Sequence, residues 1–200
     1  MPILGITGGI ATGKSLFTAS LAALVPALRV FDADQCSHGL TTSDPLILAA
    51  IRQQFGPGVF NDAGVLQRPA LRTIVFSDPE KRKALEAILH PAIRRSWFDL
   101  AQAIRTGPGG SSLAVDIPLL FETSVEAQFD KVIVVACSAS TQLQRLTQNR
   151  RLSPALAESM IASQLPLSEK ISRADILIWN DGIPESLERQ TRLLSQHLFA

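Results

Sequence analysis

The chain has 200 residues, a length typical of one or two domains. Apolar residues make up 46% of it, which predicts a packed core and argues against intrinsic disorder. Its 19 basic and 18 acidic residues leave a net charge of +1, so no overall charge favours nucleic acid or an acidic membrane as a partner.

Five short apolar runs predict β-strands that are covered on both faces, because the apolar residues are continuous rather than alternating. In chain order, these strands are 3–7, 29–32, 113–116, 132–137 and 175–179. A helix is predicted over 14–24, as the next element after the first strand. Another is predicted over 184–199, after the last strand. Strands that alternate with helices pair in parallel through right-handed crossovers, so we predict an α/β fold with a mainly parallel five-stranded sheet.

Two long intervals without a predicted strand interrupt this alternation. The first, 35–106, is predicted to be largely helical and to close with a Gly-rich loop over 107–112, and the second is 141–174. Between Arg68 and Arg105 there are eight basic and four acidic residues, which fits either an anionic ligand or a solvated helix face. We predict that the first interval is a helical substrate-binding domain and the second a lid, since two inserted segments can hold a bound molecule and close over it. The remaining core consists of 1–34, 107–140 and 175–200.

The sequence argues against targeting segments and against sites built on cysteine. No apolar run approaches the roughly 18 residues that a membrane helix needs, and the N-terminus lacks the basic region of a signal peptide. Cys36 and Cys137 have no close spacing, which argues against a zinc site and a disulfide framework. We expect a cytoplasmic protein with no nucleic-acid, membrane or obligate protein partner.

The segment between the first strand and the first helix matches the phosphate-binding motif GxxxxGK[ST]. It consists of Gly8, Gly9, Ile10, Ala11, Thr12, Gly13, Lys14 and Ser15. Glycine allows the backbone to approach a ligand closely, and the N–H groups of such a loop and of the following helix converge on the β-phosphate. Lys14 reaches the β- and γ-phosphate oxygens and the Ser15 hydroxyl is a ligand for Mg²⁺, so we predict nucleotide binding with Mg²⁺ as cofactor.

The loop alone does not identify the class of nucleotide-binding protein. The Asn/Thr-Lys-x-Asp motif of guanine-nucleotide switches and the Leu-Ser-Gly-Gly-Gln motif of transporter ATPases are both absent from the sequence. The run 113–116 resembles a Walker B strand, but Pro118 follows at once and no Glu is next to Asp116, which argues against hydrolytic motors. Small-molecule kinases are favoured, since they need an acceptor site rather than a residue that positions water.

Two carboxylates, Asp32 and Asp34, lie at the end of the second predicted strand. Ligands gather at the carboxyl ends of parallel strands, so these side chains are expected near the transferred phosphoryl group. Side chains alternate along a strand, so both would point the same way if the strand continued to residue 34. A kinase needs one carboxylate to accept the hydroxyl proton and can use another to support the metal.

Further short motifs follow in order along the whole chain. After 5–15 come Asp32-Ala33-Asp34, the segment 62–71, Leu89-His90-Pro91 and Ile117-Pro118-Leu119-Leu120-Phe121-Glu122. The C-terminal part adds 142–146, 161–164, 174–175, Asn180 and Gly182. Each motif is weak alone, but in this order they are specific, and the sequence resembles the dephospho-CoA kinase family. Leu16 stands where the family often has Thr, and Trp179 where Asp is usual; neither change removes the expected chemistry.

The resemblance implies that ATP phosphorylates the ribose 3′-hydroxyl of dephospho-CoA to give CoA and ADP, the final step of coenzyme A biosynthesis. It implies a P-loop kinase core with a helical CoA-binding domain and a lid. The residues it places at ATP are 11–16, Arg150 and Asn180, and it puts Arg145 and Arg150 on the side of the lid. Its catalytic set is Lys14, Asp32, Asp34 and Arg145. Within that set, Asp34 is implied as the general base and Asp32 as a neighbour that supports Mg²⁺.

Three further residues are expected on the substrate side, and each has a structural alternative. His90 belongs to the His-Pro pair of the family, which is also typical of a helix-breaking turn with a hydrogen-bonded histidine. Arg68 either contacts a CoA phosphate or begins a solvated helix. Glu122 has a functional interpretation, in which it holds groups of the lid or of the acceptor. Its structural alternative is a helix cap or an ion pair.

Two other functions remain as alternatives. A nucleoside or nucleoside-monophosphate kinase would share the core, and a non-catalytic sensor would share the nucleotide site. The Asp-Ala-Asp, His-Pro and Pro-Leu-Leu-Phe-Glu motifs argue against the first alternative. Lys14, Asp34 and Arg145 argue against the second, because a sensor needs no base.

Overall fold

The computed structural model describes residues 2–107 and 110–199. The chain divides into two compact units, one formed by Met1–Phe31 with Ala103–Ala200 and the other by Asp32–Gln102. Of the Gly-rich loop predicted over 107–112, Pro108 and Gly109 lie outside the described residues.

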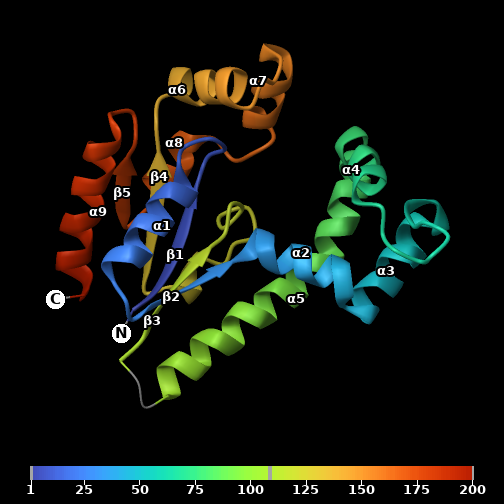
Figure 1. Ribbon diagram of the computed structural model, residues 1–200, viewed down its shortest axis with the longest axis horizontal. Helices are drawn as coiled ribbons and strands as arrows, with labels where there is room; N and C mark the ends of the chain where they lie inside the picture. The colour runs from blue at the N-terminus through green and yellow to red at the C-terminus, as the bar shows by residue number, and fades with distance from the viewer. Residues whose placement is uncertain (1, 108–109, 200) are drawn as a thin grey trace. The chain divides into compact units, whose positions relative to one another are not determined.

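The first unit contains a five-stranded sheet with the order β2-β3-β1-β4-β5 (Figure 1). Its strands are β1 (Ile3–Gly8), β2 (Leu28–Asp32), β3 (Ser112–Asp116), β4 (Lys131–Ala136) and β5 (Ile176–Trp179). β1 pairs in parallel with β3 and β4, and β4 pairs in parallel with β5. The predicted α/β class and its mainly parallel sheet are confirmed, with each strand boundary within one residue of the prediction.

The expectation that all the strands are covered on both faces is wrong for β2 and β5, the two edges of the sheet. Val30 in β2 is 41% exposed and Leu177 in β5 is 43% exposed, whereas β1 and β3 are buried throughout. An edge strand has a neighbour on one side only, so its apolar side chains are less covered. The amide of Gln190 bonds to the free edge of β5, donating to Trp179 O at 2.9 Å and accepting from Trp179 N at 3.0 Å.

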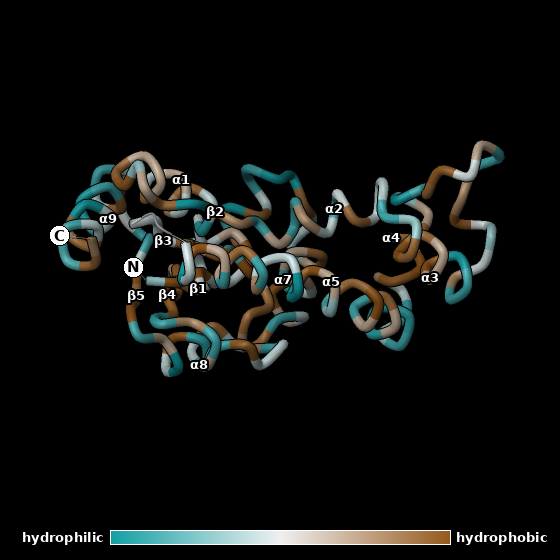
Figure 2. The backbone as a smooth tube through the Cα atoms, turned by 90° about the horizontal axis from the view of Figure 1, so that it is seen from below, coloured by the Kyte–Doolittle hydropathy of each residue, from teal (hydrophilic) through white to brown (hydrophobic). Residues whose placement is uncertain are grey.

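Helices cover both faces of this sheet. On one side of the strands lie α1 (Lys14–Leu24) and α9 (Pro184–Phe199), which pack against each other, and on the other side lies α8 (Leu167–Ser172) (Figure 2). The remaining helical elements are η2 (Glu126–Gln128), α6 (Ala139–Gln144), the π-helix η3 (Arg145–Asn149) and α7 (Pro154–Ala162). The core between the strands, α1 and α9 includes Phe17, Leu21, Ile133 and Leu187. The bounds of α1 and α9 match the predicted helices.

The second unit is helical, as the sequence predicts for this part of the chain. Its elements are α2 (Ala33–Ser43), α3 (Pro45–Phe55), η1 (Pro57–Val59), α4 (Arg68–Ser77) and α5 (Pro79–Thr106), whose last four residues belong to the first unit. The helix-breaking turn considered at His90-Pro91 is wrong, because α5 continues through Pro91. Apolar residues before and after Pro91, such as Leu89 and Ile93, pack into the same core, which keeps the helix in one piece.

Two kinds of feature are absent from the described residues. None of the helices in this part of the chain combines the length and the apolar character that crossing a bilayer requires. Within residues 2–107 and 110–199, His, Cys, Asp and Glu side chains form no group of three or more that could hold a metal ion.

Candidate active site

The phosphate loop connects β1 to the N-terminus of α1, as the motif predicts. Gly13 precedes the helix with a φ of 92°, and a Cβ there would lie 2.2 Å from Asn180 Nδ2, so only glycine fits. Ala11 also has a positive φ, of 60°, which costs a non-glycine residue about 1 kcal/mol or more. Strain of this kind is typical of a loop whose backbone is shaped for a ligand.

Side chains from other elements hold the middle of the loop in place. Ile10 donates its N–H to Gln164 Oε1 at 2.9 Å, and its carbonyl accepts a hydrogen bond from Gln142 Nε2 at 2.8 Å. Thr12 donates its N–H to Gly9 O at 3.4 Å. The N–H groups of Ile10 and Thr12 are therefore used within the protein, and their predicted contact with phosphate stays a prediction.

Lys14 lies at the first position of α1, where its ammonium forms an ion pair with Asp116 at the end of β3. The Lys14 side chain is 14% exposed and that of Asp116 is 6% exposed. Thr18 Oγ1 donates to the second carboxylate oxygen of Asp116 at 3.2 Å. Asp116 was not among the predicted site residues, although the Walker B pattern of 113–116 was a signal for it.

Arg145 and Asn180 form a clamp on the C-terminal half of the loop. Arg145, the first residue of η3, donates to Ala11 O and Thr12 O at 3.2 Å each and to Asn180 O at 2.8 Å. Asn180, which is buried, donates from Nδ2 to Thr12 O at 2.8 Å. The predicted catalytic residue Arg145 and the predicted ATP-binding residue Asn180 thus both contact carbonyl groups of the phosphate loop.

Ser15, Leu16 and Arg150 are the exposed members of the predicted ATP set. Ser15 and Leu16 belong to the first turn of α1, and Arg150 follows η3. Mg²⁺ bound to a nucleotide needs only one or two protein oxygens beside the phosphates and water. The exposed hydroxyl of Ser15, next to Lys14 in the phosphate-binding motif, fits such a metal.

Two titratable groups beside the clamp have shifted pKa values. The pKa of Asp181 is lowered, chiefly because its carboxylate accepts the backbone N–H of Ser138 at 2.8 Å. Burial raises the pKa of the Cys137 thiol to about 11. At neutral pH the site therefore holds an ionised Asp181 and a neutral thiol, which excludes Cys137 as a nucleophile.

The second unit contains a cavity of about 260 Å³ between three helices. Its lining residues recur at helical spacing: Asp34, Ser37, His38 and Thr41 from α2; Arg68, Leu71, Arg72 and Val75 from α4; Leu85 and Leu89 from α5; and Leu66. One wall is polar and basic and the rest is apolar. His38 and Arg72 were not predicted to lie beside Asp34 and Arg68, although the four-residue spacing places each pair on one face of a helix.

Asp32 and Asp34 do not lie on one continuous strand. β2 ends at Asp32, whose carboxylate accepts the Gln35 N–H at 2.9 Å and caps α2, and Asp34 lies in the first turn of that helix. The condition for the two side chains to point the same way is therefore not met. The reason is local, because an N-cap aspartate starts a helix where the strand would have continued. Asp34 is exposed and lines the cavity.

The other three predicted substrate-side residues differ in their surroundings. Arg68 lines the cavity and donates to His38 O at 2.6 Å and to Thr41 Oγ1. His90 is half-buried in α5 and is not among the cavity's lining residues. Glu122 pairs with Lys170, so the ion pair considered for it is present, and its part in acceptor binding stays a prediction.

The chain is similar to several known proteins. The family model for dephospho-CoA kinase matches residues 2–185. The dephospho-CoA kinase of Symbiobacterium thermophilum is 44% identical over 94% of this chain and 77% of its own length. Among solved structures, TT1252 from Thermus thermophilus is 31% identical with a TM-score of 0.80, over 99% of this chain and 98% of its own. The Campylobacter jejuni dephospho-CoA kinase is 27% identical with a TM-score of 0.73, over 98% of this chain and 96% of its own.

Proposed function

Since the chain belongs to the dephospho-CoA kinase family, we propose that it transfers the γ-phosphoryl group of ATP to the ribose 3′-hydroxyl of dephospho-CoA. The products are CoA and ADP, so this is the final step of coenzyme A biosynthesis. The observation that carries the proposal is the phosphate loop with Lys14 at the start of α1, in a chain that the family model matches over most of its length. A cytoplasmic location goes with this proposal, since ATP is the phosphoryl donor.

On the donor side, the proposal assigns charge stabilisation to the phosphate loop. Phosphoryl transfer is catalysed mainly by positioning and by preorganised charge around the transferred group. Asp116 holds the Lys14 ammonium at the helix N-terminus, where it meets the β- and γ-phosphates. Mg²⁺, when bound, would neutralise charge on the same phosphates, and Ser15 and Asp32 are the proposed protein ligands.

On the acceptor side, the cavity of the helical unit fits an anionic molecule with an apolar part. Arg68 and Arg72 supply positive charge, and five leucine and valine side chains supply apolar surface. Dephospho-CoA has phosphates, a ribose and an extended pantetheine arm, so it matches both kinds of lining. We assign Asp34 in this lining as the base that accepts the ribose hydroxyl proton.

One experiment tests the proposed function directly. The purified protein is given ATP and Mg²⁺ with dephospho-CoA, adenosine, AMP or no acceptor, and ADP release is followed in a coupled assay. We expect turnover with dephospho-CoA and CoA as the product. Preferred turnover of adenosine or AMP would establish the alternative kinase instead, and nucleotide binding without turnover on any acceptor would establish the sensor.

Arg68 provides a test of the acceptor cavity. We expect Arg68→Ala to raise the KM for dephospho-CoA roughly tenfold, because a charge-assisted hydrogen bond to phosphate is lost, and to leave the KM for ATP unchanged. Arg95→Ala removes an exposed arginine of α5 outside the cavity lining and serves as the control. Equal effects of the two substitutions would show that Arg68 acts only through the overall positive charge of the helical unit and not through a contact with the substrate.

Arg145 provides a test of the clamp. We expect Arg145→Ala to weaken binding of a non-hydrolysable ATP analogue, measured by calorimetry, because three hydrogen bonds to Ala11, Thr12 and Asn180 are lost. Arg145→Lys should not restore binding, since an ammonium lacks the planar fork that reaches several carbonyls. A loss confined to kcat with normal binding would instead assign Arg145 to transition-state charge, where an arginine is worth roughly 10³ to 10⁵ in rate.

A further inference from the structure

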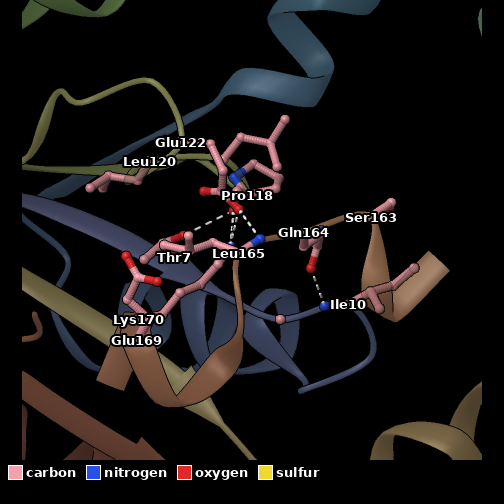
Figure 3. Close-up of polar contacts among 12 residues, drawn as sticks. Thr7, Ile10, Pro118, Leu120, Glu122, Ser163, Gln164, Leu165, Glu169 and Lys170 are labelled. Atoms are coloured by element: carbon pink, nitrogen blue, oxygen red, sulfur yellow. Dashed lines mark hydrogen bonds and ion pairs between the residues drawn. The ribbon is translucent and has the colours of Figure 1, made fainter. Parts of the chain in front are cut away.

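A fully buried lysine lies near the phosphate loop, and the proposed function does not yet use it. Lys170 in α8 has no exposed side-chain surface; its ammonium donates to Pro118 O at 3.1 Å and pairs with Glu122 Oε1 at 2.8 Å (Figure 3). Burying an ammonium is costly, and a well-packed apolar side chain at such a site is often as stabilising. Fold stability alone is therefore a weak reason for a lysine at this buried position. The contacts of its ammonium group indicate a further role.

The contacts of Lys170 lead to the middle of the phosphate loop. Glu122 Oε1, the atom that pairs with Lys170, also accepts the N–H of Leu165 at 3.0 Å. The residue before Leu165 is Gln164, whose Oε1 accepts the N–H of Ile10 at 2.9 Å. Figure 3 shows this path from α8, through the loop that follows β3 and the segment before α8, to Ile10.

A second contact joins the same lysine to the strand that precedes the loop. The carbonyl of Pro118, which accepts from Lys170, also accepts from Thr7 Oγ1 at 3.1 Å, and Thr7 belongs to β1 (Figure 3). The entry to the phosphate loop and its middle are therefore both connected to one ammonium group. The residue after Ile10 is the strained Ala11, so holding the Ile10 peptide opposes relaxation of the turn.

We propose that Lys170 and Glu122 are positioning residues for ATP, which keep the phosphate loop in its phosphate-binding conformation through Gln164 and Pro118. Preorganised donors pay no reorganisation cost when the ligand binds, so a loop that is held in this way binds phosphate more tightly. The inference rests on the proposed use of ATP and is independent of which acceptor is phosphorylated.

Lys170→Met is the substitution that tests the role of this pair. Methionine fills much of the space of lysine without its charge, and the Glu122 side chain, 22% exposed, can be hydrated in its place. We expect Kd and KM for ATP to rise roughly 5- to 30-fold, corresponding to one or two kcal/mol, with the KM for dephospho-CoA unchanged. Hydrogen exchange should become faster in peptides covering 8–13 and stay unchanged in β3.

Lys131→Met is the matched control, because Lys131 forms an exposed ion pair with Asp175 at 3.3 Å in the same unit. It should change neither ATP binding nor exchange in the loop. Gln164→Leu cuts the path next to Ile10 and should weaken ATP binding while leaving the Lys170–Glu122 pair in place, which keeps the test decisive if Lys170→Met does not fold.

Unchanged ATP affinity in Gln164→Leu would overturn the proposal. If Lys170→Met folds, two further results would overturn the proposal: equal losses of affinity for both substrates, or faster hydrogen exchange throughout the unit. Either result would mean that Lys170 only supports the fold. ATP Kd and exchange are measured without an acceptor, so a failure of the proposed kinase reaction would appear separately, in the turnover assay.

Discussion

Replacement of Lys14 by alanine is expected to lower kcat by about 10²-fold or more, which is the usual cost of removing one preorganised donor from a transition state. Lys14 is the cation of the phosphate loop and lies at the first residue of α1, where the helix dipole also favours phosphate. The measurement is steady-state ADP release at saturating ATP and dephospho-CoA, with calorimetry for ATP affinity. Near-normal kcat in Lys14→Ala would contradict the role given to the loop.

Stability has to be separated from catalysis in this experiment, because Lys14 pairs with the buried Asp116. Leaving a buried carboxylate without its partner costs about 3 kcal/mol or more, so Lys14→Ala is expected to unfold at a lower temperature. The double substitution Lys14→Ala with Asp116→Asn removes the unpaired charge and keeps a group that can bond to Thr18. It should recover stability without recovering turnover, and recovery of both would show that Lys14 acts only through the fold.

The sequence predicted most of the fold because its strongest signals are local. The apolar runs and the phosphate loop are each contained within a few consecutive residues, so the strands and α1 were predicted to within a residue. Exposure was not predictable in the same way, since β2 and β5 also contain apolar runs and become edges only through the strand order. The sequence also gave no sign that α5 would continue through Pro91.

The site was predictable where a motif carries it and hidden where distant residues meet. Lys14, Arg145 and Asn180 were expected at the nucleotide, and the structure places all three at the phosphate loop. The contacts of Gln142 and Gln164 with Ile10 join residues more than 130 positions apart, and nothing in their local sequence indicates those partners. The motifs containing these glutamines could be recognised, but their physical role required the fold.

Asp34 is expected to be the base of the reaction, and Asp34→Asn tests that role. Asparagine is nearly isosteric with aspartate and keeps hydrogen bonding, but it cannot accept the ribose hydroxyl proton. A positioned general base contributes roughly 10²- to 10⁴-fold, so kcat should fall by about that factor. Dephospho-CoA should still bind in calorimetry, because the arginines and the apolar walls of the cavity are unchanged.

Asp32→Asn is the matched comparison, because the two aspartates are separated by one residue and differ in position. Asp32 caps α2, and asparagine is as good an N-cap as aspartate, so the helix that carries Asp34 should be retained. If Asp32 supports Mg²⁺, its substitution lowers kcat at low Mg²⁺ and is partly rescued as the Mg²⁺ concentration rises. Asp34→Asn should not be rescued, because metal cannot replace the lost proton acceptor.

Steady-state kcat for both variants across a Mg²⁺ titration decides between the two assignments. Rescue of Asp34→Asn alone would exchange the roles and make Asp34 the residue that supports the metal. Near-normal turnover in both variants would mean that neither carboxylate is the base. The transition state of phosphoryl transfer is loose, with little bond formation to the attacking oxygen, so the hydroxyl proton would then leave after the phosphoryl group has moved.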